Sequence, residues 1–156
     1  METLSSLKSK KMIDQDIFNN DISFQGVKGL IFIGDKIVVF RRDNKTNNFP
    51  LQVDLPGGGR EDNESPLETF KREINEEFGI NIEKEDVVFS KKYPSILDSS
   101  KVAYFIVTRP LNINENEIVF GDEGLEFFLM TPKDFVSLSD GVKKQQEKVV
   151  EYLDTY

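Results

Sequence analysis

Short apolar runs rich in Val, Ile and Phe alternate with turn residues along the chain. Residues 27–33 and 36–41 flank Gly34-Asp35, a pattern typical of a β-hairpin. Further strands are expected at 51–55, 87–90, 101–109 and 125–130. The run Pro56-Gly57-Gly58-Gly59 is expected to end its strand and form a tight loop.

One segment has the pattern of an amphipathic helix, from Pro66 to Phe78. Ser65 is a good N-cap, Glu68 completes a capping box, and Gly79 suits the left-handed terminator. The apolar positions recur at helical spacing on one stripe: Leu67, Phe70, Ile74 and Phe78. Because strands lie on both sides of this helix in the sequence, we expect an α/β fold with a mixed sheet and packed helices.

The remaining segments complete this outline. A short helix is expected to open at Thr131-Pro132, and a C-terminal helix to cover residues 143–153. Residues 1–21 are expected to be an N-terminal tail or short helix, followed by a single domain over residues 22–156.

Composition restricts the chemistry more than the fold. The 156 residues contain no Cys and no His, which excludes thiol nucleophiles, imidazole bases and Cys- or His-bound metals. The net charge of -8 argues against nucleic-acid or membrane partners. No signal-peptide pattern is visible at the N-terminus, so a cytoplasmic location is expected.

Three carboxylates share one flank of the predicted helix, beside its apolar stripe. At about 100° per residue, Glu73, Glu76 and Glu77 lie within reach of one another. Clustered carboxylates are ligands that Mg²⁺ prefers. A solvated helix face is the alternative, because acidic triplets on exposed helices are common.

The glycine run and this helix together form a known pattern. Gly58-x5-Glu64-x7-Arg72-Glu73-Ile74-x-Glu76-Glu77-x-Gly79-Ile80 matches every fixed position of the Nudix box, so the chain resembles a Nudix hydrolase. The resemblance implies a Nudix-like α/β/α sandwich with a mixed β-sheet and a loop–helix–loop catalytic motif.

The same resemblance implies roles for the residues of the box. Glu73, Glu76 and Glu77 would hold Mg²⁺, with Mn²⁺ as a substitute, and Glu76 and Glu77 would be its direct ligands, together with a backbone carbonyl near Gly57 or Gly58. Arg72 would orient Glu73 or its neighbours. Glu64 would be an accessory acid near the helix start, close to the substrate.

Further acids and arginines outside the box are candidates for the rest of the site. Candidates for the general base are Glu73 and the downstream acids Asp122, Glu123 and Glu126, of which Glu123 is favoured over Glu126. Glu126 is also a candidate metal ligand, and either Glu123 or Glu126 could instead be a surface residue. Arg41 and Arg42 could bind substrate phosphate, but strand alternation places them on opposite faces, so only one should line the site.

The substrate expected from the resemblance is a nucleoside diphosphate linked to another group. A nucleoside triphosphate, ribo or deoxy, is favoured, cleaved by a pyrophosphohydrolase reaction. An ADP-ribose or nucleotide-sugar pyrophosphatase and a non-catalytic nucleotide-binding domain are the alternatives. The intact glutamates favour the enzyme. Both a monomer and a homodimer fit the sequence. Aromatic candidates for base stacking are Phe49, Tyr93 and Phe105.

Overall fold

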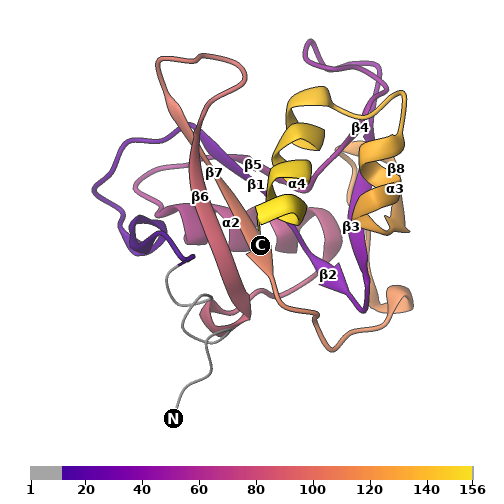
Figure 1. The fold of residues 1–156 in the computed structure, drawn as a ribbon, viewed down its shortest axis with the longest axis horizontal. Coiled ribbons are helices and arrows are strands. Elements are labelled where there is room, and N and C mark those ends of the chain that lie inside the picture. The colour runs from indigo at the N-terminus through magenta and orange to yellow at the C-terminus, as the bar shows by residue number, and fades with distance from the viewer. Residues whose placement is uncertain (1–11, 156) are drawn as a thin grey trace.

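Two small β-sheets share the centre of the protein in the computed structural model, which describes residues 12–155 (Figure 1). In the first sheet β1 (Gly26–Leu30) pairs in parallel with β7 (Val102–Thr108). The outer strands β5 (Gly57–Gly59) and β6 (Val87–Pro94) run antiparallel to their neighbours. The order β5-β1-β7-β6 makes this the expected mixed sheet.

The second sheet is antiparallel and is organised around one long strand. β3 (Lys36–Arg42) pairs with β2 (Phe32–Ile33) and β4 (Val53–Asp54), and also with β8 (Gly124–Met130). The predicted strand at 27–33 is therefore divided between the two sheets, with buried Ile31 at the division.

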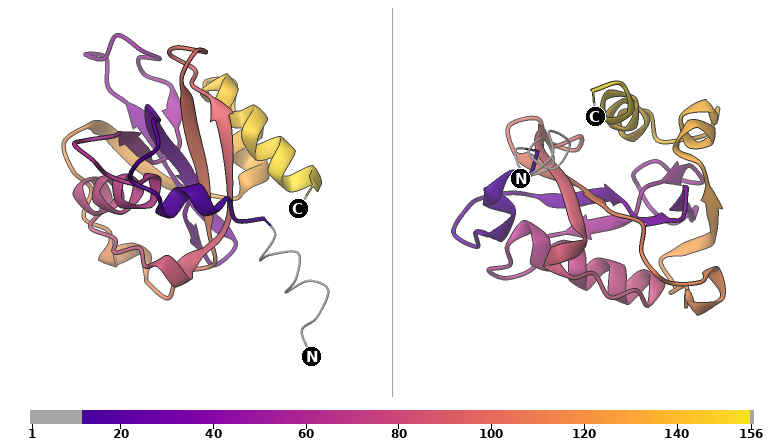
Figure 2. Two further views of the ribbon diagram at one scale, coloured as in Figure 1. Left: turned by 90° about the vertical axis from the view of Figure 1, so that its left-hand side faces the viewer. Right: turned by 60° about the horizontal axis from the view of Figure 1, so that its bottom comes forward.

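Two long helices cover opposite faces of the strands. Figure 2 shows α2 (Pro66–Phe78) on one side and α4 (Lys143–Thr155) on the other, and α3 (Pro132–Ser137) lies beside β8 in Figure 1. Single turns of 3-10 helix occur at η1 (Gln15–Phe18), η2 (Lys84–Asp86) and η3 (Glu115–Glu117). The expected α/β/α sandwich is confirmed.

Each helical layer has its own apolar core. Phe70, Ile74 and Phe78 of α2 pack with Val27 and Ile106 in one cluster. The other cluster places Val149 of α4 and Phe135 of α3 with residues from the opposite face of the strands. Alternation along β1 and β7 sends successive side chains to the two cores, as a sheet covered on both faces requires.

The α2 helix begins and ends as the sequence predicts. Ser65 and Glu68 form a reciprocal capping box, and Gly79 at φ 66° ends the helix with its N–H donating to the carbonyl of Asn75. These caps fix where the acidic flank of the helix lies relative to the strands.

The glycine run is the main correction to the predicted elements. Gly57–Gly59 does not form a loop; it forms β5, paired with β1 through Gly26, Val27 and Lys28. Gly57 has φ +141°, and a Cβ there would lie 2.1 Å from the carbonyl oxygen of Val27. Glycine is needed because the strand approaches β1 so closely.

The N-terminal segment is described only in part. Residues 1–11, most of the expected tail or short helix, lie outside the described residues. Within the described part, η1 packs Ile17 fully into the core against α2. Among residues 12–155, no helix is both long and apolar enough to span a bilayer.

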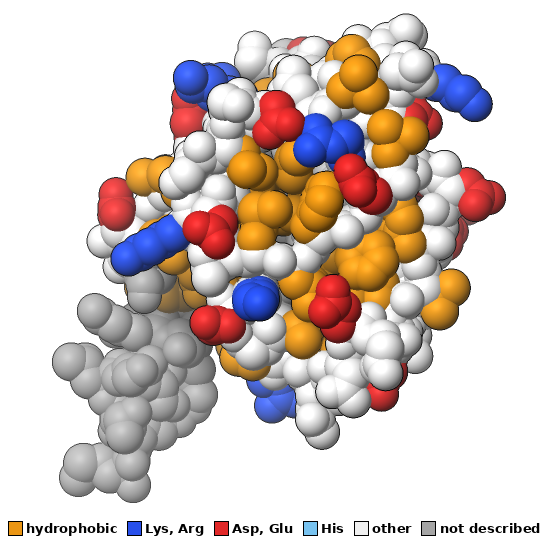
Figure 3. All heavy atoms as spheres, turned by 90° about the vertical axis from the view of Figure 1, so that its right-hand side faces the viewer, with side chains coloured by type: hydrophobic (Ala, Val, Ile, Leu, Met, Phe, Trp, Pro, Cys, Tyr) orange, Lys and Arg blue, Asp and Glu red, His pale blue; other side chains and the backbone are white. Residues whose placement is uncertain are grey.

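The second sheet leaves one side of the molecule apolar. β8 carries mostly half-buried hydrophobic side chains, and Leu125 is exposed. Figure 3, which faces the β8 and α3 side, shows hydrophobic side chains grouped in the middle of this surface.

Candidate active site

Three carboxylates converge at the edge of the mixed sheet. Glu73 and Glu77 lie one helical turn apart on α2 and are both buried, while Glu123 comes from the exposed loop before β8. One oxygen from each lies within 4.8 Å of the others. The group lines a cavity of about 480 Å³, which we call the acidic cavity.

The loop that carries Glu123 is fastened to the end of α2. The N–H groups of Val119 and Gly121 donate to the carbonyls of Phe78 and Glu77, at 3.0 Å and 2.7 Å. The ring of Phe120 packs against that of Phe78, with centroids 5.6 Å apart. These contacts place Glu123 opposite the helical carboxylates.

Burial and crowding shift the protonation of this cluster. Burial, and then the hydrogen bond with Glu123, raise the pKa of Glu77 to about 10, against the opposing charge of Lys28. Burial also raises the pKa of Glu73, although Arg72 counteracts it. Without a cation, three carboxylates this close cannot all be ionised near neutral pH. The donor set therefore fits a hard divalent metal ion.

β5 packs directly against this cluster. A Cβ on Gly58 would lie 2.3 Å from the carboxyl carbon of Glu73, so no side chain fits at this position. The equivalent point on Gly59 has no atom nearer than 3.9 Å. Gly58 thus lets the backbone of β5 approach the acidic side chains.

Arg72 links the helix to the preceding loop. Its guanidinium donates to Glu64 at 2.7 Å and 3.0 Å, to Glu73 at 3.0 Å, and to the carbonyl of Gly59 at 2.8 Å. Hydrogen bonding to Arg72 holds the pKa of Glu64 below its ordinary value. Arg72 therefore fixes Glu73 and the end of β5 in one arrangement.

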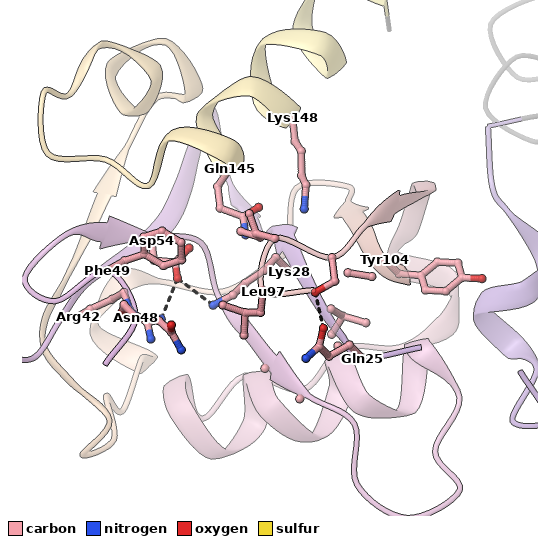
Figure 4. Close-up of a pocket in the computed structure, with 17 residues that line it drawn as sticks. Gln25, Lys28, Arg42, Asn48, Phe49, Asp54, Leu97, Tyr104, Gln145 and Lys148 are labelled. Carbon is pink, nitrogen blue, oxygen red and sulfur yellow. Dashed lines mark hydrogen bonds and ion pairs between the residues drawn. The ribbon is translucent and has the colours of Figure 1, made fainter. Parts of the chain in front are cut away.

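A second cavity, of about 270 Å³, adjoins the first beneath α4; we call it the α4 cavity. The two share Lys28, Arg42, Gly58 and Gly59 on their walls. In Figure 4, Gln145 and Lys148 project into the α4 cavity from α4, and Leu97 and Phe49 form part of its sides. Asp54 accepts from Lys28 at 3.0 Å and from Arg42 at 2.9 Å at this junction.

A family model for the NUDIX domain matches residues 24–153. The chain belongs to the Nudix family. Nudix proteins form a hydrolase family of pyrophosphohydrolases, and the predicted Nudix box lies within the matched region. No curated protein sequence matches the chain.

Solved structures share the Nudix fold at low sequence identity. The MutT protein from Methanosarcina mazei Go1 has a TM-score of 0.65 and 20% identity, covering 86% of this chain and 95% of that one. A MutT NUDIX hydrolase from Burkholderia pseudomallei has a TM-score of 0.61 and 16% identity, covering 80% and 94%.

A third match is a bifunctional NMN adenylyltransferase/ADP ribose pyrophosphatase from Francisella tularensis, with a TM-score of 0.64 and 15% identity. It covers 97% of this chain, which spans 48% of that longer protein. At these identities the matches show a common fold.

The structure separates the glutamates of the Nudix box. Glu73 and Glu77 enter the cluster, whereas Glu76 is exposed and contacts Arg72 at 3.4 Å, outside the 4.8 Å group. Glu64 lies behind the helix, where it holds Arg72 and Thr69 rather than lining a cavity. Gly57 and Gly58 both line the acidic cavity.

The candidate residues outside the box also lie at different places in the structure. Glu123 lies in the cluster, but Glu126 is exposed and contacts Arg41 at 3.5 Å. Arg41 pairs with Asp140 at 2.8 Å, away from both cavities. Arg42 lines both cavities, so the expected alternation leaves one arginine at the site, with a β-bulge between the two.

The aromatic candidates have different positions as well. Phe49 lines the α4 cavity, Phe105 is fully buried in the core, and the hydroxyl of Tyr93 donates to Glu151.

The sequence pattern did not identify four residues as candidates for the site: Lys28, Asp54, Gln145 and Lys148. All four line the α4 cavity, and three of them are almost fully buried. The only signal in the sequence is a charged residue within an apolar strand pattern, as at Lys28 and Asp54. Nothing in the pattern of α4 distinguishes Lys148 from the other lysines of that helix.

Proposed function

We propose that this Nudix hydrolase cleaves a phosphoanhydride bond of a nucleoside triphosphate in a Mg²⁺-dependent reaction, releasing a nucleoside monophosphate and pyrophosphate. The observation that carries the proposal is the group of three carboxylates within 4.8 Å beside the glycine strand β5. Such a group suits a metal ion that neutralises phosphate charge during hydrolysis.

Glu73 and Glu77 are the residues that would hold the metal. Both are buried on a capped helix, and Arg72 donates a hydrogen bond to the carboxylate of Glu73. Gly58, whose backbone packs against Glu73, is the neighbouring main-chain position of the proposed site. Bound Mg²⁺ would supply charge neutralisation at the phosphate oxygens.

Glu123 is the residue that would accept the proton of the attacking water. It lies in the same cluster but is exposed, and it sits on a loop rather than on the rigid helix. With no His in the chain, a carboxylate is the natural base. Lys28 and Arg42, on the wall common to both cavities, would bind phosphate oxygens.

The substrate itself is tested with a panel of nucleoside triphosphates, nucleotide sugars, ADP-ribose and dinucleoside polyphosphates. Phosphate release is measured with Mg²⁺, with Mn²⁺ and with chelator, with inorganic pyrophosphatase added to reveal pyrophosphate. We expect triphosphates to be cleaved only with metal. Preferred cleavage of ADP-ribose, the activity named for the Francisella protein, would replace the triphosphate assignment.

The assignment of Glu123 needs a separate measurement. Glu123→Gln should lower turnover while Mg²⁺ binding, followed by calorimetry, stays close to that of the wild type. A matched loss of Mg²⁺ affinity and turnover would instead make Glu123 a metal ligand. The neighbouring exposed Asp122→Asn serves as the control.

A further inference from the structure

Two buried polar side chains of α4, Gln145 and Lys148, line the α4 cavity. The carboxamide oxygen of Gln145 is buried and has no hydrogen-bond partner among residues 12–155. Lys148 is 7% exposed, and within the same residues its ammonium group makes no ion pair; its described contact is with the ring face of Tyr93, at 5.1 Å. Buried polar groups without partners are uncommon and costly.

The carboxylate that attracts Lys148 makes its hydrogen bonds elsewhere. Asp54 attracts the ammonium electrostatically, but among residues 12–155 its ion pairs are with Lys28 and Arg42. Its second oxygen accepts from the N–H of Leu55. The ammonium of Lys148 is therefore available to an acceptor from outside the protein.

The size and lining of the α4 cavity suit a small, partly apolar ring. Its volume of about 270 Å³ is near the lower limit for small-molecule sites, and Phe49, Ile96, Leu97 and Ala103 contribute apolar walls. Gln145 and Lys148, which Figure 4 shows projecting from α4, line the α4 cavity alone, whereas Lys28 and Arg42 line both cavities. A nucleotide with its phosphates in the acidic cavity would therefore direct its base toward this pair.

Gln145 and Lys148 lie three residues apart, so they are neighbours on one face of α4. An ammonium group can only donate, whereas the free atom of Gln145 is an acceptor. Together they match an edge that presents an acceptor beside an N–H donor. A carbonyl next to a ring N–H has this arrangement, as in hypoxanthine, guanine and uracil. An amino group next to a ring nitrogen presents the two functions at exchanged positions, so its exocyclic group would meet Lys148 as a donor facing a donor.

We propose that the Gln145–Lys148 pair recognises the base of the substrate and selects bases with a carbonyl rather than an amino group at the exocyclic position. Lys148 donates to the carbonyl oxygen, and Gln145 accepts from the adjacent ring N–H. The carbonyl is placed at Lys148 because a buried charge gains most from the strongest acceptor. This selectivity rests on the proposed nucleotide-hydrolase function.

Two pairs of substrates isolate the exocyclic position. ITP and ATP differ only there and at the adjacent ring nitrogen, and so do UTP and CTP. For the wild type we expect kcat/KM to favour ITP over ATP, and UTP over CTP, by about tenfold or more. In Lys148→Met the ratio should approach one. Lys144→Met is the matched control, because Lys144 is exposed on the same helix and does not line the α4 cavity.

Binding of nucleoside monophosphates separates this proposal from the proposed hydrolysis. IMP and UMP should stabilise the wild type against thermal unfolding more than AMP and CMP do, and Lys148→Met and Gln145→Leu should each reduce the difference. If IMP and UMP show this effect but no triphosphate is cleaved, the hydrolase proposal fails and the base selectivity stands.

The opposite results would overturn the selectivity. Triphosphate cleavage with ratios near one, a preference for ATP and CTP, or a wild-type ratio retained by Lys148→Met would each contradict the role of the pair. Absence of both cleavage and monophosphate binding would overturn both proposals.

Discussion

The acidic cavity and the α4 cavity adjoin but bury opposite charges. The first gathers the carboxylates of Glu73, Glu77 and Glu123 around one point, and the second holds the buried Lys148, which has no ion pair among residues 12–155. In both, burial disfavours the charged form, raising the pKa of Glu77 and lowering that of Lys148. Each therefore calls for a ligand of complementary character, a cation in one and an acceptor in the other.

The two cavities also differ in the elements that line them. The acidic cavity is lined by the glycine strand β5 and by α2, by β1, β3 and residues 43–46, and by Glu123. The α4 cavity shares β1, β3 and β5 with it and adds residues 48–49, β4, β7, the 95–101 loop and α4. The comparison suggests that one cavity performs the chemistry, whereas the other determines the substrate.

Glu77→Gln should have the largest effect, because it removes one of the two buried carboxylates proposed to hold the metal. Turnover should fall by about a hundredfold or more. Without metal, the variant should unfold at about the same temperature, because the raised pKa of Glu77 already leaves this carboxyl uncharged near pH 7 and Gln keeps its size. Steady-state rates and thermal unfolding in chelator measure the two effects. A large loss of stability with activity retained would return Glu77 to a structural role.

Gly58→Ala should have the next largest effect, because the added Cβ would lie 2.3 Å from the carboxyl carbon of Glu73. Displacing Glu73 should lower activity by about tenfold to a hundredfold and raise the Mg²⁺ concentration needed for half-maximal rate. Gly59→Ala is the matched control, since its nearest neighbour would be 3.9 Å away. Equal behaviour of the two variants would contradict the close packing of β5 on the cluster.

Lys148→Met should stabilise the protein. It removes a buried cation without a carboxylate partner, and we expect a gain of about 1–3 kcal/mol in the free energy of unfolding near pH 7. The charged groups facing Lys148 are Asp54 on β4 and Lys28 on β1, and the ring of Tyr93 lies on β6.

The size of this effect should depend on pH in a defined window. Burial lowers the pKa of Lys148 from 10.5 to about 8. Between these values the unfolded chain keeps the proton that the folded protein has released, so wild-type stability rises with pH relative to Lys148→Met. The advantage of the variant should therefore be full below pH 8 and vanish by about 10.5. Denaturant unfolding across this range tests it; a constant difference would contradict the lowered pKa.

Glu126→Gln should have the smallest effect. Its carboxylate is exposed and meets Arg41 at 3.5 Å, outside both cavities. Exposed ion pairs contribute about 0–1 kcal/mol, so turnover should stay within about twofold of the wild type. A loss comparable with that of Glu77→Gln would show that β8 contributes to the reaction.

Sequence predicted the α2 region well because its signals are local. Ser65, Glu68 and Gly79 fix the ends of the helix, and helical spacing alone puts Glu73 and Glu77 on one flank. Sequence missed β5, because a strand of three glycines exists only through its pairing with β1. It also could not separate Glu76 from Glu77, since that difference depends on which side of the flank meets the sheet.

The residues that line the α4 cavity could not be predicted from the sequence, for the same reason. Lys148 is one of several lysines on a polar helix, and its burial follows from the way α4 packs over β1, β4 and β6. Tertiary contacts of this kind leave no periodic trace in the sequence.

The proposal that the acidic cavity performs the reaction and the α4 cavity selects the base has one most direct test. ITP and ATP hydrolysis are compared in the wild type, Glu77→Gln and Lys148→Met under identical Mg²⁺ conditions. We predict that Glu77→Gln lowers kcat/KM for both substrates by the same large factor, whereas Lys148→Met changes mainly their ratio. Unchanged rates in Glu77→Gln, or an unchanged ratio in Lys148→Met, would contradict the separate roles of the two cavities.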